Sequence, residues 1–203
     1  MKLGILDYGM GNLHSLRKKI QINGHNSTII EKPKSILSCD KIILPGVGHF
    51  GKAISNIHDL NFFDSLNEFV LVKKKPILGI CLGMQLMTKK SEEGNVDGLG
   101  WFDAEVVRFN NKDPYKYKVP HIGWNKINIS KLSNIMTNIS ANDEFYFVHS
   151  YHAISNSKDV LTTTNYESNF VSAIERENIF GVQYHPEKSH EAGQTLITNF
   201  IEL

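Results

Sequence analysis

Cysteine is scarce in this chain, which contains only two, Cys39 and Cys81, in 203 residues. Two cysteines do not make a disulfide framework in a chain of this size, and in a reducing compartment a lone reactive thiol is the better expectation than a bridge. Cys39 lies in Ser-Cys-Asp before a predicted strand and has no flanking glycine, so we expect it to be structural. Cys81 is left as the candidate reactive thiol.

An excess of charge of one sign and long apolar runs are missing as well. Twenty-two Lys and Arg face twenty-one Asp and Glu, a net charge of +1, which predicts neither a nucleic-acid footprint nor a polybasic membrane anchor. No segment approaches the roughly 18 apolar residues of a membrane span, and Asp7 interrupts the N-terminus before a signal-peptide apolar region could form. We therefore expect a cytoplasmic protein without a nucleic-acid or membrane partner.

The first part of the chain alternates short apolar runs with helical patterns. This alternation predicts an α/β fold with a central, mostly parallel sheet and flanking helices. The predicted strands are Leu3–Leu6, Ser27–Ile30, Lys41–Leu44 and Pro76–Ile80, and the predicted helices are Leu13–Ile22 and Phe62–Val72.

The pattern changes beyond Gly100 to strand candidates broken by Asn, Asp and Ser, so the second half is expected to be an additional β-rich portion. A helix over Ala192–Glu202 closes the chain. No repeat, linker or low-complexity tract marks a boundary, which predicts a single domain over residues 1–203. The predicted strands of this half are Ala104–Phe109, Lys126–Ile129, Phe145–Val148, Leu161–Thr164, Val171–Ile174 and Ile179–Gln183.

The strongest local motif is Gly79-Ile-Cys-Leu-Gly83, between a buried strand and a helical stretch near Met84. It is the cysteine counterpart of the nucleophile elbow, in which glycines on both sides tolerate a sharp strand-to-helix turn. A helix N-terminus behind Cys81 would stabilise a thiolate, and the N–H of Leu82 would be placed to donate to an oxyanion. The alternative is a buried structural cysteine between packing glycines.

A second motif, His185-Pro-Glu187, follows a candidate strand. Pro186 excludes a helix there, and in an extended chain residues two apart point the same way, so the imidazole and the carboxylate would share one face. Glu187 could then orient His185 while the other ring nitrogen faces a thiol. On its own the motif would most often be a solvated turn that carries a His and a Glu, and its weight comes from its presence together with the elbow.

Two other patterns receive little weight. Gly46, Gly48 and Gly51 spell a dinucleotide fingerprint, but Pro45 interrupts the strand-to-loop step, so a plain turn or an oxyanion loop is favoured and no cofactor is expected. His149 and His152 form one histidine cluster and the His185 segment another. Neither has the ligand spacing of a helical zinc motif, and we predict no metal site.

Together these segments resemble the class I (triad) glutamine amidotransferases and, more narrowly, the glutaminase subunit of imidazole glycerol phosphate synthase. The resemblance runs almost end to end and implies the flavodoxin-like fold of that class. The elbow and His-Pro-Glu are shared by the whole class, whereas the first and fourth of the following segments point to the narrower group. The segments are Asp7-Tyr-Gly-Met-Gly-Asn12, Pro45-Gly-Val-Gly48, Gly79-Ile-Cys-Leu-Gly-Met-Gln85, Val119-Pro-His-Ile-Gly-Trp-Asn125, Phe147-Val-His-Ser-Tyr151 and Gly181-Val-Gln-Tyr-His-Pro-Glu-Lys-Ser189.

The resemblance implies a role for each matching position. Cys81 would be the nucleophile, His185 the base and acid, and Glu187 the residue that orients His185. The oxyanion hole would use the N–H groups of Val47 and Leu82. The substrate glutamine would be held near Gly48, Gln85, Ser150 and Tyr151, and a γ-glutamyl thioester would form and be hydrolysed to glutamate.

The resemblance also implies a heterodimer in which ammonia crosses a channel into a TIM-barrel cyclase subunit and is built into imidazole glycerol phosphate for histidine biosynthesis. Such glutaminases are activated when the cyclase binds its ligand. Positions that the family places at or near this interface are Asn12, Pro120, Trp124, Tyr146 and Lys188.

Alternatives remain open for the partner and the acceptor. Gly98-Leu-Gly-Trp101 and the polar insert Asn110–Lys118 resemble a paralogous branch that supplies ammonia for amidation of a surface-polysaccharide sugar. A stand-alone cysteine peptidase or γ-glutamyl hydrolase would use the same elbow and histidine without a partner.

Overall fold

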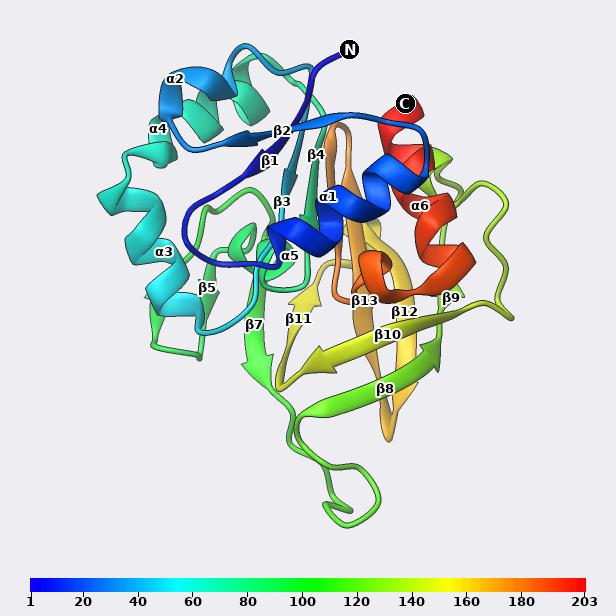
Figure 1. Ribbon diagram of the computed structural model, residues 1–203. Helices are drawn as coiled ribbons and strands as arrows, with labels where there is room; N and C mark the ends of the chain where they lie inside the picture. The colour runs from blue at the N-terminus through cyan, green and yellow to red at the C-terminus, as the bar shows by residue number, and fades with distance from the viewer.

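The computed structural model describes all residues from 1 to 203, and its centre is a five-stranded parallel sheet (Figure 1). The strands lie in the order β2, β1, β3, β4, β14, each hydrogen-bonded in parallel to its neighbour. The first four of them alternate with helices along the chain, as predicted, and β14 joins from the far end of the sequence. Their bounds are β1 (Leu3–Leu6), β2 (Ser27–Ile30), β3 (Lys41–Leu44), β4 (Ile77–Ile80) and β14 (Ile179–Val182).

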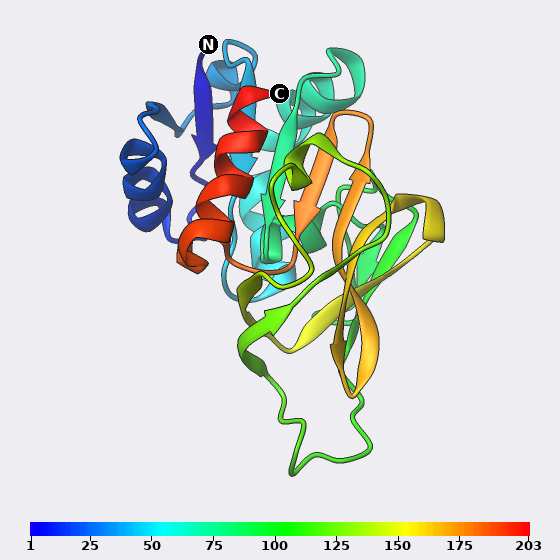
Figure 2. The same cartoon turned by 90° about the vertical axis from the view of Figure 1, so that its right-hand side faces the viewer.

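Helices cover both faces of this sheet. Successive residues of a strand point to opposite faces, so Ile42 and Leu44 join one buried cluster with helices α3, α4 and α5, while Ile43 joins another with α1 and α6. Figure 2 shows α1 and α6 together on one side of the strands. The helices are α1 (Leu13–Ile22), α2 (Pro33–Ile36), α3 (Phe50–Asp59), α4 (Phe62–Asn67), which continues as a π-helical turn (Glu68–Val72), α5 (Leu82–Leu86) and α6 (His190–Glu202).

Mostly antiparallel strands extend the sheet, which confirms the expected β-rich portion of the second half; β5 and β7 alone pair in parallel there. Strand β13 pairs with β14 and carries the order on through β11, β7, β5 and β6, while β12 pairs with β13 and with β9. The bounds are β5 (Lys90–Ser91), β6 (Val96–Asp97), β7 (Ala104–Arg108), β9 (Asn128–Ile129), β11 (Tyr151–Ser155), β12 (Val160–Tyr166) and β13 (Ser168–Arg176).

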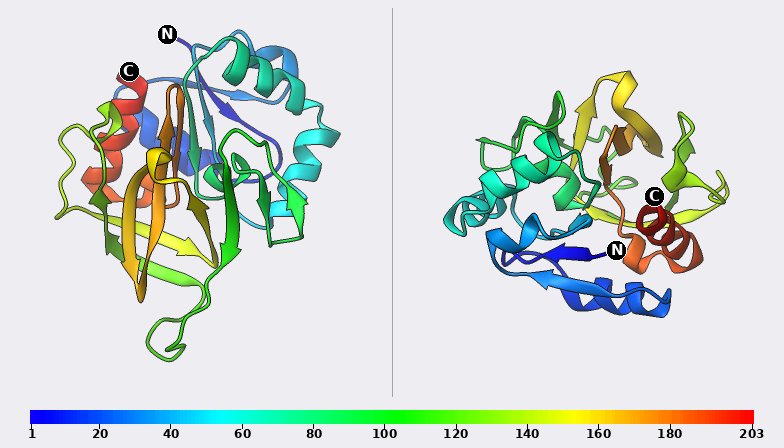
Figure 3. Two further views of the ribbon diagram at one scale, coloured as in Figure 1. Left: turned by 180° about the vertical axis from the view of Figure 1, so that it is seen from behind. Right: turned by 90° about the horizontal axis from the view of Figure 1, so that it is seen from above.

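Strands β8 (His121–Lys126) and β10 (Glu144–His149) form a separate antiparallel ribbon. The ribbon lies across the β-rich portion, and the segment between β7 and β8 projects from the molecule as a long loop (Figure 3). Short 3-10 turns over Asn134–Met136, Ser157–Asp159 and Pro186–Lys188 complete the chain. None of the helices is both long and apolar enough to cross a membrane.

The predicted strand Lys126–Ile129 was wrong in its bounds, because β8 ends at Lys126 and a separate short strand begins at Asn128. The pattern of β8 is the reverse of an ordinary strand. Its buried face carries His121, whereas Ile122 and Trp124 are 59% and 42% exposed. A search for buried apolar alternation therefore passes over it.

Candidate active site

The candidate site lies at the carboxyl ends of the parallel strands, where open α/β sheets place their ligands. Pro45–Gly48 follows β3, Cys81 follows β4, and His185 comes three residues after the end of β14. Because β3, β4 and β14 are neighbours in the sheet, segments far apart in sequence converge there. The sheet order thus brings the elbow and the His-Pro-Glu segment together.

Cys81 itself carries the strain of the elbow, with φ of 54° and ψ of −110°. This is a conformation that a residue with a Cβ rarely adopts. The flanking glycines are needed for a different reason, which is close packing. A Cβ at Gly79 would lie 2.7 Å from the carbonyl oxygen of Gly83, and a Cβ at Gly83 would overlap the carbonyl oxygen of Leu44. Helix α5 is thereby pressed against β4 and β3.

Two backbone N–H groups near the thiol have no acceptor within the chain, those of Leu82 and Val47. Leu82 is the first residue of α5, and the first N–H groups of a helix lack intrahelical partners. Val47 belongs to the loop after β3, and both residues line the cavity at Cys81. Neither N–H group is committed to another acceptor, which the predicted oxyanion role requires.

His185 and Glu187 form a buried pair. Nδ1 of His185 lies 2.7 Å from Oε1 of Glu187, and the two side chains are only 2% and 6% exposed. The expectation that Pro186 excludes a helix was wrong. Residues Pro186–Lys188 form a 3-10 turn with the proline at its first position, where its missing N–H costs nothing. The contact is made around this turn and not along an extended strand.

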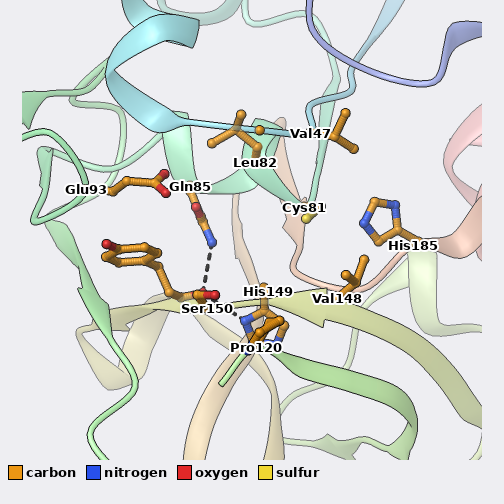
Figure 4. Close-up of a pocket in the computed structure, with 12 residues that line it drawn as sticks. Val47, Cys81, Leu82, Gln85, Glu93, Pro120, Val148, His149, Ser150 and His185 are labelled. Carbon is orange, nitrogen blue, oxygen red and sulfur yellow. Dashed lines mark hydrogen bonds between the residues drawn. The ribbon is translucent and has the colours of Figure 1, made fainter. Parts of the chain in front are cut away.

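The turn is fastened to strand β10. Ser189 Oγ donates to the carbonyl of His185 at 2.6 Å and accepts from the N–H of Tyr146 at 3.0 Å, and the N–H of His185 donates to the carbonyl of Tyr146 at 2.9 Å. These bonds fix the backbone beneath the imidazole. The remaining nitrogen, Nε2, has no partner within the chain, and its edge of the ring is turned toward Cys81 (Figure 4).

The electrostatics of the pair favour an imidazolium. Burial opposes the charged form, but the neighbouring Cys81 thiol and the Glu187 carboxylate, which accepts from Nδ1, outweigh burial and raise the pKa of His185 to about 10. Such a histidine can hold a proton beside a thiolate and release it to a leaving group.

A cavity of about 410 Å³ opens in front of Cys81. Cys81 lies in the middle of its wall, with His185 on one side and Gln85 on the other (Figure 4). The structure therefore brings together eight of the predicted site residues, while Glu187 stands behind His185. The eight lining residues are Val47, Gly48, Cys81, Leu82, Gln85, Ser150, Tyr151 and His185.

Two residues at the site were missed by the sequence analysis. Glu93 is the only carboxylate of the cavity lining, and its Oε2 accepts from the N–H of Phe50 at 2.7 Å. It lies in a polar run that reads as a solvated loop, so no local signal could have found it. Gln183 is fully buried with Nε2 3.6 Å from Sγ of Cys81. Its place two residues before His185 was an available signal.

Three of the predicted partner residues, Trp124, Tyr146 and Lys188, lie in one patch, and the other two lie outside it. Trp124 of β8 is paired with Tyr146 of β10, the indole stacks parallel on His190 at 4.6 Å, and Nζ of Lys188 lies 5.6 Å from the Tyr146 ring centre. Asn12 instead caps helix α1, accepting from the N–H of Ser15 at 3.1 Å, and lines a small cleft with Glu187. Pro120 lines the cavity itself.

No group of three or more His, Cys, Asp or Glu side chains is arranged to hold a metal ion. The two histidine clusters have other uses. His149 bonds to His121 and to a backbone carbonyl, and His185 bonds to Glu187.

Comparison with known proteins agrees with this geometry. Residues 4–203 match the family model described as glutamine amidotransferase class-I. Among solved structures, one described as a glutamine amidotransferase superposes with a TM-score of 0.77 at 15% identity, covering 100% of this chain and 98% of the other. PurLQS from Thermotoga maritima gives a TM-score of 0.74 at 15% identity, covering 99% and 97%. At this identity the likeness concerns the fold.

Sequence relatives are much nearer. The chain is 45% identical over 201 residues to imidazole glycerol phosphate synthase subunit HisH 2 of Methanococcus maripaludis, covering 98% of both chains. It is 40% identical to subunit HisH of Leptospira borgpetersenii, covering 99% of this chain and 100% of the other. The chain therefore belongs to the class I glutamine amidotransferases and, within that class, to the HisH family of imidazole glycerol phosphate synthase subunits.

Proposed function

We propose that this chain hydrolyses glutamine with Cys81 as nucleophile and passes the ammonia to a cyclase subunit that forms imidazole glycerol phosphate. The observation that carries the proposal is the arrangement at the cavity. A cysteine held in a strained turn faces the unpartnered Nε2 of His185, and the other nitrogen of that ring is bonded to buried Glu187. This is the nucleophile, base and orienting carboxylate of a triad.

In the first half of the reaction, Sγ of Cys81 attacks the side-chain amide carbon of glutamine. The carbonyl oxygen becomes an oxyanion, which accepts from the N–H groups of Val47 and Leu82. The imidazolium of His185 then gives its Nε2 proton to the leaving nitrogen, the carbon–nitrogen bond breaks, and ammonia departs from a γ-glutamyl thioester. Glu187 stabilises the imidazolium before that transfer because its Oε1 accepts from Nδ1.

The second half removes the glutamyl group. Neutral His185 takes a proton from a water molecule at Nε2, the hydroxide adds to the thioester carbon, and the same two N–H groups hold the oxyanion. Collapse breaks the carbon–sulfur bond and releases glutamate, and the proton on His185 again stands beside a thiolate.

The far end of the cavity suits the α-ammonium of glutamine. Glu93 supplies a negative charge there, and its Oε1 makes no hydrogen bond within the chain. Both N–H bonds of the Gln85 amide are used, one for the carbonyl of Tyr151 and one for Gln183, so only its oxygen is left for substrate. Gln85 thus serves as an acceptor, and Gly48 and Ser150 form the rest of this wall.

The partner face is the outer side of the β8–β10 ribbon. Ile122 pairs with Val148 and Trp124 with Tyr146, which places four apolar side chains in a row on a strand pair whose other side is buried. Lys188 stands beside this row over Tyr146. An exposed apolar face rimmed by charge fits a protein partner, here a TIM-barrel cyclase.

The experiment measures glutamate release from glutamine by the chain alone and with a cyclase barrel and its nucleotide ligand. Cys81→Ala serves as the blank. We expect strong activation by the liganded cyclase, and none in Cys81→Ala. Cys81-dependent activity that ignores the cyclase would contradict the assigned partner. It would favour the sugar-amidation branch, whose resemblance rests partly on the projecting Asn110–Lys118 segment, or a stand-alone hydrolase.

A further inference from the structure

Gln183 is the side chain that contacts the Cys81 thiol from inside the protein. It is the first residue after β14 and is fully buried. Its Nε2 lies 3.6 Å from Sγ of Cys81, within the range of an N–H to sulfur hydrogen bond, and its Oε1 accepts from Nε2 of Gln85 at 2.9 Å. The triad mechanism above does not use it.

The orientation of this amide is set by a backbone carbonyl. The carbonyl oxygen of Tyr151 can only accept, so the group of Gln85 that meets it at 3.0 Å must be the nitrogen. The second N–H of that nitrogen then points at Gln183, which must present its oxygen. The nitrogen of Gln183 is consequently left to face Cys81, and a flipped amide would break two bonds at once.

The same carbonyl also accepts from His149, which is in turn held by His121. Nδ1 of His149 lies 2.8 Å from the Tyr151 oxygen and must carry a hydrogen, which leaves Nε2 of that ring as an acceptor. Nδ1 of His121 lies 3.1 Å from this Nε2 and donates to it, and Nε2 of His121 in turn faces the amide of Asn125 at 3.5 Å. The donor and the acceptor of every bond from β8 to the thiol are therefore fixed, and the Tyr151 carbonyl accepts from His149 on one side and from Gln85 on the other.

The surroundings keep both histidines neutral, as this pattern requires. His121 stacks on Tyr166 at 4.0 Å and on Phe147 at 4.9 Å, and the His149 ring lies 5.2 Å from that of Phe170. Burial lowers the pKa of His149 to about 3 and that of His121 to about 4. The tautomers that the network needs therefore persist at neutral pH.

We propose that Gln183 is a further catalytic residue, whose amide N–H donates to the Cys81 thiolate, and that His149 and His121 are positioning residues that fix this amide through the Tyr151 carbonyl and Gln85. An N–H donor from the protein interior adds to the stabilisation of the thiolate by the His185 imidazolium and does not occupy the substrate side. The path begins at His121 on the inner face of the β8–β10 ribbon, whose outer face carries Trp124 and Tyr146.

The test is the rate of alkylation of Cys81 by iodoacetamide as a function of pH, followed by mass spectrometry of the Cys81 peptide so that Cys39 does not interfere. Only the thiolate reacts, so the midpoint of the profile reports its stability. In Gln183→Met, we expect the midpoint to rise by roughly one pH unit, since a hydrogen bond to a charged group is lost. Gln183→Leu is the second variant should the methionine protein fail to fold.

The matched control is Asn178→Leu. Asn178 is an amide at the opposite end of β14 that donates to the carbonyls of Val70 and Lys75 at 2.9 Å, so its loss removes two comparable hydrogen bonds away from the site. We expect its alkylation profile to match the parent protein. A shift in this control as large as that in Gln183→Met would overturn the assignment.

The positioning role is tested by His149→Leu, for which we expect a smaller rise of roughly half a pH unit. His149→Asn keeps a donor near the Nδ1 position and should restore part of the shift. The double variant with Gln183→Met should shift no further than Gln183→Met alone, because Gln183 is the last link. Additive shifts, or no rescue by Asn, would overturn the relay.

This inference rests on the proposed nucleophilic role of Cys81, but the alkylation assay needs neither glutamine nor a partner. Glutaminase activity that survives Cys81→Ala would remove the proposed function. An unchanged alkylation midpoint in folded Gln183→Met and Gln183→Leu would remove only the role of Gln183. The two failures are thus read from different experiments.

Discussion

The parallel and antiparallel halves of the sheet are built on different principles. Strands β1, β3, β4 and β14 are four residues long and buried along their whole length. The side chains of these strands are mainly aliphatic, and the neighbouring elements pack closely against the strand backbone. The antiparallel strands and the β8–β10 ribbon instead bury hydrogen-bonded polar side chains, among them His121, His149, Thr162 and Ser172.

The difference assigns separate tasks to the two halves. The parallel half supplies groups placed by backbone geometry, namely the strained Cys81 and the N–H donors of Val47 and Leu82. The antiparallel half supplies side chains and carbonyls that set orientation, such as His149 and the Tyr151 oxygen. Substitutions in the parallel half should therefore change stability through steric fit. Substitutions in the antiparallel half should change it through hydrogen bonding and through the titration of histidines.

The largest effect expected in the parallel half is at Cys81 itself. Cys81→Gly removes the nucleophile and should lower kcat by at least about ten-thousandfold. It also releases the strain at φ of 54°, so the free energy of unfolding should rise by about 1 kcal/mol. Cys81→Ala, which keeps a Cβ, should be equally inactive without that gain. Urea unfolding that shows the two variants equally stable would contradict the strain at this position.

Next in size is Glu187→Gln, at the junction of the halves. The amide can still accept from His185 but lacks the charge that stabilises the imidazolium, so kcat should fall by roughly a hundredfold to ten-thousandfold. The pH profile of kcat should move as well, because the pKa of His185 is raised partly by this carboxylate. Glu177→Gln, at an exposed turn, is the control and should leave both quantities unchanged. A Glu187→Gln enzyme with parental kcat would remove the orienting role.

Two glycine substitutions separate steric fit from backbone strain. In Gly83→Ala the new methyl overlaps the Leu44 carbonyl, and the unfolding free energy should drop by about 3 kcal/mol. In Gly100→Ala the methyl group meets nothing within 4 Å. Only the backbone strain of an alanine at φ of +70° lowers the unfolding free energy, by about 1 kcal/mol. Chemical denaturation of both variants measures the difference, and equal losses would show that close packing at the elbow is not the reason for its glycine.

Acid sensitivity is expected of the antiparallel β8–β10 ribbon. His121 and His149 stay neutral when folded but titrate near pH 6.5 when unfolded, so below that pH the unfolded chain binds more protons. Stability should fall from pH 6.5 to pH 5 by up to about 1.4 kcal/mol per pH unit for each histidine. His185, with its raised pKa, is protonated throughout this range when folded, so its contribution has the opposite sign, is small, and vanishes as the unfolded chain becomes protonated toward pH 5.

Urea midpoints measured across this range test the expectation. A His121→Phe variant keeps an aromatic ring in the stack with Phe147 and removes one titrating group, so its stability should depend less steeply on pH. A parent protein whose midpoint is flat from pH 6.5 to pH 5 would show that the histidines are not held neutral.

The comparison also explains where sequence-based prediction worked. The strands Leu3–Leu6, Ser27–Ile30 and Lys41–Leu44 have the predicted bounds, because each is a short run between helical patterns or turns. The ribbon strand β8 was largely missed because its exposed face is the apolar one. Helix α3 was not predicted, although Phe50, Ala53 and Ile57 form a helical stripe. The glycine pattern that overlaps its start had been interpreted as a turn or an oxyanion loop.

The sequence by itself determined the fold class and the family and predicted the triad residues, because these depend on local patterns and short motifs. Only the tertiary structure decided how they work together. It showed that the glycines of the elbow are needed for packing and that a 3-10 turn brings Glu187 to His185. It also brought Glu93 to the cavity and Gln183 to the thiol. Such contacts join strands far apart in the chain, and the direction of a hydrogen bond is fixed by the partner that folding supplies.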